Sequence, residues 1–349
     1  RGGSVSSALV VRAPLAWLGT GSVVRDVAVV VERGLVAYAG PAADAPEPAE
    51  REEFDVDGFL MPAVADRHVH IGLADPATVI LRGVTAVRDC GWPADVIFPL
   101  ADASEMPSFT GPLIRAVGPI LTAPGGYPSR ERWAPPGTSL EVHDPGEAER
   151  AVRMLAGRGA VAIKLSLNSV AGPTLRDADL EAICSAAAEA RLPVVAHVEG
   201  QGQAERALGA GVREIAHTPW TERLSDSVVE SLAKRTRIVS TLDIQSFGGD
   251  TSEVRTAVDN LRRFHEAGGM VLYGTDLGNG PIPPGVDVRE VLLLRQAGLT
   301  VEEILQAMAR GPLQRNAPGD LLALGRNPFE ELDAVEDVRL VVRGGRVVA

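Results

Sequence analysis

The sequence predicts an α/β fold in which a (β/α)8 barrel, or TIM barrel, carries a small β-sandwich domain built from both chain ends. Between about residues 62 and 312, short apolar runs alternate with longer segments of helical period, which is typical of parallel βα units. Eight apolar runs are candidate strands, and eight strands close such a barrel. We therefore expect the small domain at 1–60 and 325–349 and the barrel at 61–324.

The elements of each domain follow from these patterns and from turn residues between them. In the small domain, strands are expected at 8–12, 26–32, 35–40, 338–342 and 346–348. The barrel strands should end near His70, Asp89, Val117, Leu165, His197, His217, Leu242 and Asp276. Helices are expected at 144–158, 176–190, 225–235, 251–267, 288–297 and 300–309. The stretch 118–137 holds nine Gly or Pro in twenty residues, so it predicts a long loop, and loops of that length are usually functional.

Composition limits the class of protein and its partners. The chain has 349 residues, of which 45% are hydrophobic and 23% charged, so it can bury a large core. The net charge of −12 argues against a nucleic acid or an anionic membrane as partner. We expect a small-molecule or peptide substrate and leave open a homo-oligomer. Two cysteines suit a reducing compartment, so the cytoplasm is the expected location.

Four of the six histidines fall at the ends of predicted strands. His68 and His70 are two residues apart, so on a strand they point to one face and could chelate one cation. His197 and His217 end the fifth and sixth strands. Because barrels place their active sites at the carboxyl ends of their strands, these imidazoles should meet at one mouth, although each alone could be a structural residue.

Two further residues suggest chemistry at this mouth. Asp276 ends the eighth strand, where it could bind metal and accept a proton from metal-bound water, or simply cap the next helix. Lys164 lies in the fourth strand and is one of only two lysines, the other being Lys234. Its ammonium would be repelled by cations inside a barrel. Either it points outward, or its neutral amine reacts with carbon dioxide to give a carbamate that can bridge two cations.

These residues together resemble the amidohydrolase superfamily, metal-dependent hydrolases on a distorted (β/α)8 barrel, and within it the imidazolonepropionase-like and prolidase-like branch. The resemblance implies that His68, His70 and Asp276 hold one metal and that His197 and His217 hold a second. It also implies that carboxylated Lys164 bridges them. The motifs that carry the resemblance are Pro62-x-x-x-Asp66-x-His68-x-His70, Gly83 to Asp89, Lys164, His197, Ile215-Ala216-His217 and Gly274-Thr275-Asp276.

The chain departs from the family pattern at two positions near the expected site. Tyr127 follows Gly125-Gly126, where relatives often have His. Glu199 stands two residues after His197, where peptidase-like members have a Tyr that polarises the scissile carbonyl. Arg130 and Arg132 of the long loop could bind a substrate carboxylate or be solvated. Three of the four tryptophans follow predicted barrel strands, where they could line the substrate site or simply pack in loops. The candidate substrate-binding residues are Trp92, Tyr127, Arg130, Trp133, Glu199 and Trp220.

The expected function is hydrolysis of an amide bond, peptide-like, N-acyl or cyclic, by a hydroxide shared between two divalent metal ions. Zinc is the expected metal because imidazole and carboxylate ligands suit it, with manganese, cobalt or iron as substitutes. Asp276 would accept the proton of the nucleophile and pass it to the leaving nitrogen. Natural-product or modified-peptide tailoring is one hypothesis for the pathway. The alternatives are a mononuclear deaminase of a nucleobase-like ring and a non-catalytic binding protein on the same fold.

Overall fold

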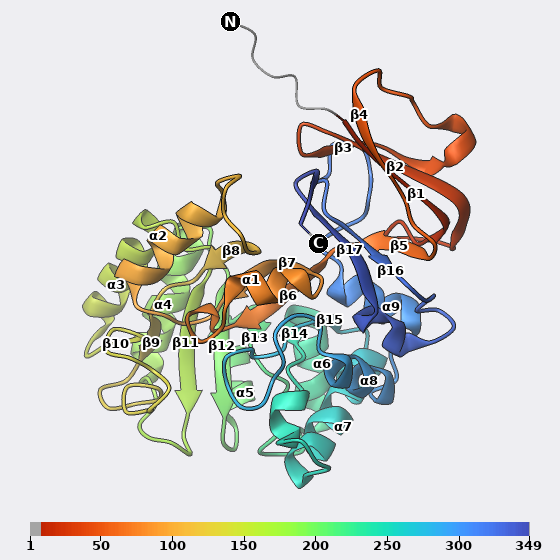
Figure 1. Cartoon of the computed structure of the whole chain (residues 1–349). Coiled ribbons are helices and arrows are strands. Elements are labelled where there is room, and N and C mark those ends of the chain that lie inside the picture. Colours follow the sequence, from red (N-terminus) through yellow and green to blue (C-terminus); the bar gives the residue numbers. More distant parts are fainter. Residues whose placement is uncertain (1–7, 349) are drawn as a thin grey trace, which may run out of the picture.

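The strands of both chain ends form one sheet at one end of the molecule in the computed structural model, which describes residues 8–348 (Figure 1). Its order is β18-β17-β16-β5-β1-β2-β3, and β4 pairs with β1. Since β5 joins β1 to β16, the strands are hydrogen-bonded into one sheet, and a separate β-sandwich is not confirmed. The strands are β1 (Ala8–Ala16), β2 (Val24–Glu32), β3 (Leu35–Pro41), β4 (Arg51–Asp55), β5 (Phe59–Pro62), β16 (Leu321–Leu324), β17 (Val338–Arg343) and β18 (Arg346–Val347).

The middle of the chain contains parallel strands in two sheets. One sheet has the order β6-β7-β8, and the other has the order β10-β9-β11-β12-β13-β14-β15. The first is made of β6 (Val64–Val69), β7 (Val84–Asp89) and β8 (Leu113–Ala116). The second is made of β9 (Ile120–Thr122), β10 (Ser139–Glu141), β11 (Ile163–Asn168), β12 (Val194–Glu199), β13 (Glu214–Ile215), β14 (Arg237–Val239) and β15 (Met270–Leu272).

The predicted closed barrel is not found among residues 8–348. The two parallel sheets are separated by one gap between β8 and the start of β11 and by another between β15 and β6. At each gap, isolated backbone hydrogen bonds take the place of a continuous ladder. Val161 N donates to Ala116 O at 3.0 Å, and Asp276 N donates to His68 O at 2.8 Å. Strand β15, which borders one gap, has only three residues, and the chain beyond it enters the left-handed region at Asp276 (φ 63°). The regular ladder of the seven-stranded sheet therefore stops before it reaches β6.

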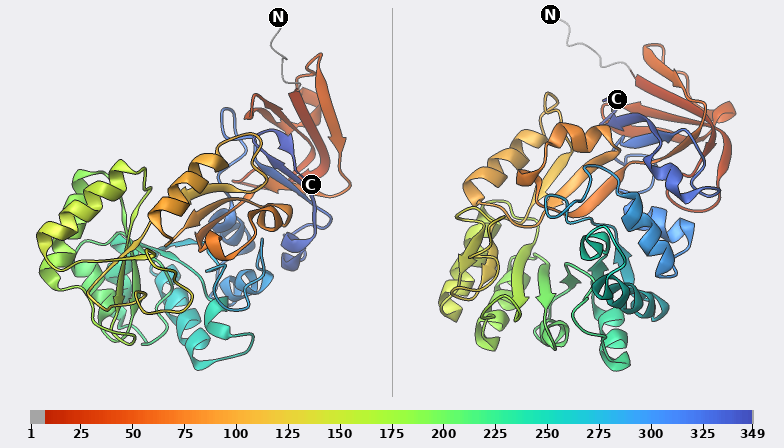
Figure 2. Two further views of the ribbon diagram at one scale, coloured as in Figure 1. Left: turned by 60° about the vertical axis from the view of Figure 1, so that its left-hand side comes forward. Right: turned by 60° about the horizontal axis from the view of Figure 1, so that its bottom comes forward.

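Helices flank the parallel strands on their outer side (Figure 2). The six predicted helices appear within one or two residues of their expected bounds, and most of them begin after a residue whose side chain caps the first turn. Asp144, Ser225, Thr251 and Thr300 each accept a backbone N–H of the first turn. The helices are α1 (Pro76–Leu81), α2 (Ala94–Ser104), α3 (Pro145–Gly157), α4 (Asp177–Glu189), α5 (Gln203–Gly209), α6 (Asp226–Arg235), α7 (Ser252–Glu266), α8 (Val288–Gln296) and α9 (Val301–Met308).

Buried side chains fill the space between the parallel strands. Every residue of β11 is buried, as expected of a parallel strand covered on both faces. A fully buried carboxylate, Glu214, begins β13 and forms ion pairs with Arg88 and with Arg237, whose Nε lies 2.6 Å from Glu214 Oε2. These pairs occupy the interior near the amino ends of β13 and β14, which leaves the carboxyl ends for a cavity.

Across residues 8–348, no helix has the length and apolar character that crossing a bilayer demands.

Candidate active site

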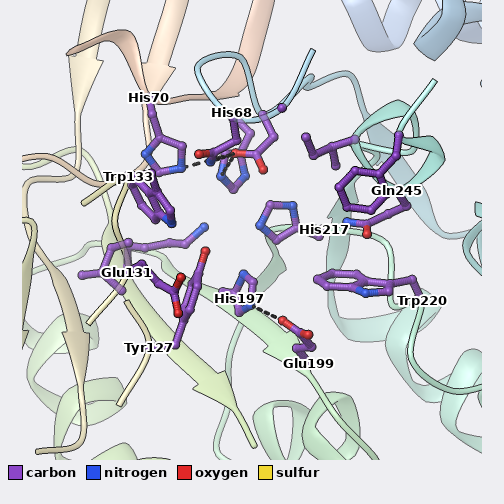
Figure 3. A pocket seen from close by; sticks show the side chains of 17 residues that line it. His68, His70, Tyr127, Glu131, Trp133, His197, Glu199, His217, Trp220 and Gln245 are labelled. Carbon is purple, nitrogen blue, oxygen red and sulfur yellow. Dashed lines mark hydrogen bonds and ion pairs between the residues drawn. The ribbon is translucent and has the colours of Figure 1, made fainter. Parts of the chain in front are cut away.

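A cavity of about 410 Å³ opens where the parallel strands end (Figure 3). Its walls combine imidazoles, carboxylates and aromatic rings. The lining residues either lie within a parallel strand or belong to the segment that follows one. They are His68, His70, Ile120, Tyr127, Glu131, Trp133, Lys164, His197, Glu199, His217, Trp220, Ile244, Gln245, Phe247, Asp276, Asn279 and Gly280.

Three of these residues form a compact group of metal-ligand atoms. His68 Nε2 lies 3.5 Å and His70 Nε2 lies 3.3 Å from Asp276 Oδ1. One ligand atom from each of the three side chains falls within 4.8 Å of the other two, and all three residues are buried. Two imidazoles and a carboxylate at this spacing suit a divalent transition metal.

Backbone contacts orient the two imidazoles of this group. His68 Nδ1 donates to Ala216 O at 2.9 Å, and His70 Nδ1 donates to Gly91 O at 3.1 Å. Because a carbonyl can only accept, each Nδ1 carries the proton and each Nε2 presents its lone pair to the cavity. Contacts of this kind fix the tautomer of a metal-binding histidine.

Asp66 links the strand that carries His68 to the segment that carries Asp276. Its carboxylate accepts the backbone N–H of His68 at 2.9 Å and the hydroxyl of Thr275 at 2.5 Å. Burial raises the pKa of Asp66 to about 7, although these hydrogen bonds oppose the shift. Asp66 therefore connects the end of β6 to the segment that follows β15, where Asp276 lies.

His197 and His217 form a second pair beside the first group. The rings of His68 and His217 have their centroids 4.4 Å apart, and those of His197 and His217 are 4.9 Å apart. His217 Nδ1 lies 2.8 Å from Thr241 Oγ1, which leaves Nε2 available. His197 Nε2 lies 3.3 Å from Glu199 Oε2, so in this imidazole Nδ1 is the nitrogen left to bind a cation.

Lys164 provides the observation that most favours a metal centre. Its side chain points inward from β11 and is 1% exposed, and Nζ has no hydrogen-bond partner among residues 8–348. His68 Nε2 is likewise buried and, in the same part of the chain, makes no hydrogen bond. Unpartnered buried polar atoms are unfavourable, so a cluster of them facing one cavity indicates a bound group that satisfies them. The imidazoles and the carboxylate of this cavity are residue types that can hold a divalent cation.

Burial sets the protonation of this cluster. It lowers the pKa of His68 and His217 well below the ordinary value and lowers the pKa of His197. Burial also lowers the pKa of Lys164, which favours its neutral amine. Burial lowers the pKa of His70, but Asp276, Asp89 and the Gly91 carbonyl together outweigh it, so the net direction is upward. Three of the four imidazoles are thus neutral near pH 7, which is the form that binds metal.

Aromatic side chains cover the cavity on the side of the long loop. Tyr127 stacks on His197 with ring centroids 4.8 Å apart, and the ring centroids of Trp133 and His70 are 4.6 Å apart. In Figure 3 the phenol of Tyr127 points toward the space between the histidines. Burial raises the pKa of Tyr127, so its hydroxyl stays protonated and can donate a hydrogen bond.

The structure brings together most of the residues singled out in the sequence. All six predicted metal ligands line the cavity, as do Tyr127, Trp133, Glu199 and Trp220. Trp92 is buried against Gly72 and is not part of the lining, while Arg130 and Arg132 are exposed outside it. His143 and His265 also lie elsewhere, as expected.

Other lining residues were not recognised from the sequence. Glu131 belongs to the long loop, but nothing in its local pattern separates it from its neighbours. Gln245 and Phe247 follow the strand that was expected to end near Leu242, so the strand-end rule applied there could have found them. Asn279 follows Asp276 by three residues and donates to its carboxylate at 3.2 Å.

Comparisons with known proteins find similar chains but no family model. No family model matches the chain. An uncharacterized protein of Mycobacterium tuberculosis is 27% identical over 331 residues, covering 83% of this chain and 85% of the relative. The ochratoxinase of Aspergillus niger is 23% identical over 416 residues, covering 94% of this chain and 84% of the relative.

Solved structures extend the similarity to nearly the whole chain. An amidohydrolase superposes with a TM-score of 0.82 at 21% identity, covering 98% of both chains. The chain has the amidohydrolase fold. A Xaa-Pro dipeptidase with bound methionine in its active site gives a TM-score of 0.81 at 20% identity, covering 98% of this chain and 99% of that chain. The fold that the resemblance implies is thus shared with these solved structures.

Proposed function

We propose that this protein is a metal-dependent hydrolase that cleaves the carbon–nitrogen bond of an amide. The observation that carries the proposal is the convergence of four imidazoles, Asp276 and the unpartnered amine of Lys164 on one cavity. The amidohydrolase and the dipeptidase that share the fold support the same class of reaction.

The residues have distinct roles in this proposal. His68, His70 and Asp276 would hold one divalent cation, and His197 and His217 a second, with carboxylated Lys164 between them. When bound, the cations supply Lewis acidity that activates water and polarises a carbonyl. Zinc is the proposed metal because the ligands are imidazole nitrogens and carboxylate oxygens.

Asp276 is the proposed proton carrier. Water attacks the carbonyl carbon and gives a proton to Asp276, which returns it to the nitrogen as the carbon–nitrogen bond breaks. Tyr127, which stacks on His197, would donate a hydrogen bond to the carbonyl oxygen as negative charge develops there. Glu199, 3.3 Å from His197 Nε2, orients that imidazole.

The carbamate of Lys164 requires a neutral amine and carbon dioxide. Nζ forms a bond to the carbon of carbon dioxide and releases one proton, which turns the only lysine of the cavity into an anionic ligand. Burial favours the neutral amine that this reaction needs. Arginine has no primary amine and cannot replace it.

Metal content and activity test the proposal together. Purified protein should hold close to two metal ions per chain and hydrolyse members of a panel of dipeptides, N-acyl amino acids and cyclic amides. One metal with deamination of heterocyclic amines would favour the mononuclear deaminase. Bound metals without turnover on either panel would favour the non-catalytic binding protein. A role in natural-product tailoring stays a prediction.

Two substitutions of Lys164 test its proposed role as the bridging ligand. Lys164→Ala and Lys164→Arg should each lose at least one metal and most activity. Lys234→Arg is the matched control, because Lys234 is exposed on α6 and should tolerate the change. Full activity and two metals in Lys164→Ala would exclude the bridging role.

A further inference from the structure

The charged groups that line the cavity are strongly unbalanced. Within residues 8–348, the lining contains three carboxylates, those of Glu131, Glu199 and Asp276, and no arginine. Lys164 is its only lysine, and it is buried deep against the histidines. A substrate carboxylate would therefore meet anions at the walls without the guanidinium partner that usually binds it.

Two of the three carboxylates are already engaged. Asp276 lies against His68 and His70, as described above. Glu199 Oε2 accepts from Asn168 Nδ2 at 2.6 Å and lies near His197. In the described part of the chain, the carboxylate of Glu131 has no ion pair within 4.0 Å and no hydrogen bond. Glu131 is thus the carboxylate that is left to bind a substrate group.

The walls beside Glu131 are aromatic. Tyr127 and Trp133 belong to the same loop, and their ring centroids are 6.3 Å apart. Trp220 and Phe247 also line the cavity, and Phe247 is 71% exposed despite its size. Aromatic faces combined with a carboxylate suit an organic cation, because both the charge and the ring quadrupole attract it.

We propose that Glu131 selects substrates with an apolar or aromatic body and a positively charged group, such as an amine or amidine, and disfavours a free carboxylate. This substrate class deepens the hydrolase function proposed for the same cavity and rests on it. Glu131 is a specificity residue in this view, since it lies outside the set of proposed metal ligands.

Binding of three planar probes to the metal-loaded protein tests the selection without requiring turnover. Benzamidine, benzamide and benzoate have nearly the same shape and are cationic, neutral and anionic. Their Kd values can be measured by quenching of the Trp133 and Trp220 fluorescence. We expect the ratio of Kd for benzoate to Kd for benzamidine to fall at least about fivefold in Glu131→Gln, as removal of a nearby charge implies. Any contact of benzoate with the metals is common to both proteins and cancels in this comparison.

Two further variants and the neutral probe show whether the change in the Kd ratio comes from the charge of Glu131 itself. Glu149→Gln removes one charge on the exposed side of α3 and should leave the ratio unchanged. Glu131→Asp keeps the charge and should keep most of the preference. The Kd for benzamide should be the same in Glu131→Gln and the parent protein.

The outcomes are distinct from those of the hydrolase test. An unchanged ratio in Glu131→Gln, an equal fall in Glu149→Gln, or an equal change in the Kd for benzamide would overturn the selection by Glu131. A fall confined to Glu131→Gln supports it even if no amide is hydrolysed, in which case only the proposed hydrolase activity fails.

Discussion

Replacing Lys164 with methionine should stabilise the metal-free protein and remove the stabilisation that metal confers. Nζ of Lys164 is buried, has no hydrogen-bond partner and lies among imidazoles, so the metal-free fold contains an unsatisfied polar group. Methionine has a similar length and no group that requires hydration. The same substitution removes the bridging ligand, so it should weaken metal binding.

The magnitudes follow from these two effects. Leaving a buried polar group unsatisfied costs about 1–3 kcal/mol, so the free energy of unfolding of the metal-free variant should rise by an amount in that range. A metal present at roughly 100 times its Kd stabilises the native parent protein by about 2.7 kcal/mol. Lys164→Met should lose most of that gain.

Urea unfolding at pH 7 measures both effects. Each protein is unfolded after removal of metal by a chelator and again with zinc and bicarbonate present, with tryptophan fluorescence as the signal. Lys234→Met is the control. Because Lys234 is exposed, this variant should show neither effect. The reasoning is refuted if metal-free Lys164→Met is less stable than the parent, or if zinc stabilises both proteins equally.

Three further predictions concern single groups. Asp276→Asn should keep the fold and part of the metal but reduce kcat on the order of 10²-fold or more, and unchanged turnover would remove Asp276 from the proton path. Tyr127→Phe should lower kcat by about 10²-fold with unchanged metal content, since it removes one hydrogen-bond donor to the developing oxyanion, and a full kcat would contradict that role. Asp287 caps α8, and burial together with Asp243 raises its pKa from 3.8 to about 7. The folded protein therefore binds this proton more tightly than the unfolded chain, so the contribution of Asp287 to stability is lost as pH rises from about 4 through 7. Asp287→Asn keeps a good cap and should become more stable relative to the parent over that pH range in urea unfolding, and parallel pH profiles would refute the shift.

Local patterns predicted the metal-ligand candidates and six of the nine α-helices of residues 8–348, but not α1, α2 or α5. Alternation along a strand puts His68 and His70 on one face, and capping residues such as Thr300 fix where helices begin. Helix α9, for example, begins at Val301 with Thr300 as its cap, as expected from the 300–309 pattern. These features depend on residues a few positions apart, so they can be inferred before any tertiary contact is known.

The apolar pattern predicted the parallel βα arrangement, but it predicted neither the observed strand order nor the open barrel. Eight apolar runs predicted a closed barrel, whereas the described chain has two parallel sheets joined at their gaps by isolated hydrogen bonds. Whether neighbouring strands form a ladder depends on the twist and length of both, and β15, which borders one gap, has only three residues in regular pairing. That information is not contained in the apolar pattern of either strand alone.

The sequence by itself determined which residue types stand at the strand ends, and hence the histidines, Asp276 and Lys164 as candidates. Only the tertiary structure decided which loop residues face the cavity, with Glu131 inside and its neighbours Arg130 and Arg132 outside. The physical reason is that a strand alternates its side chains with a fixed period, whereas a long loop has no period. The direction of each loop side chain is set by packing against segments distant in sequence, and those contacts exist only in the folded chain.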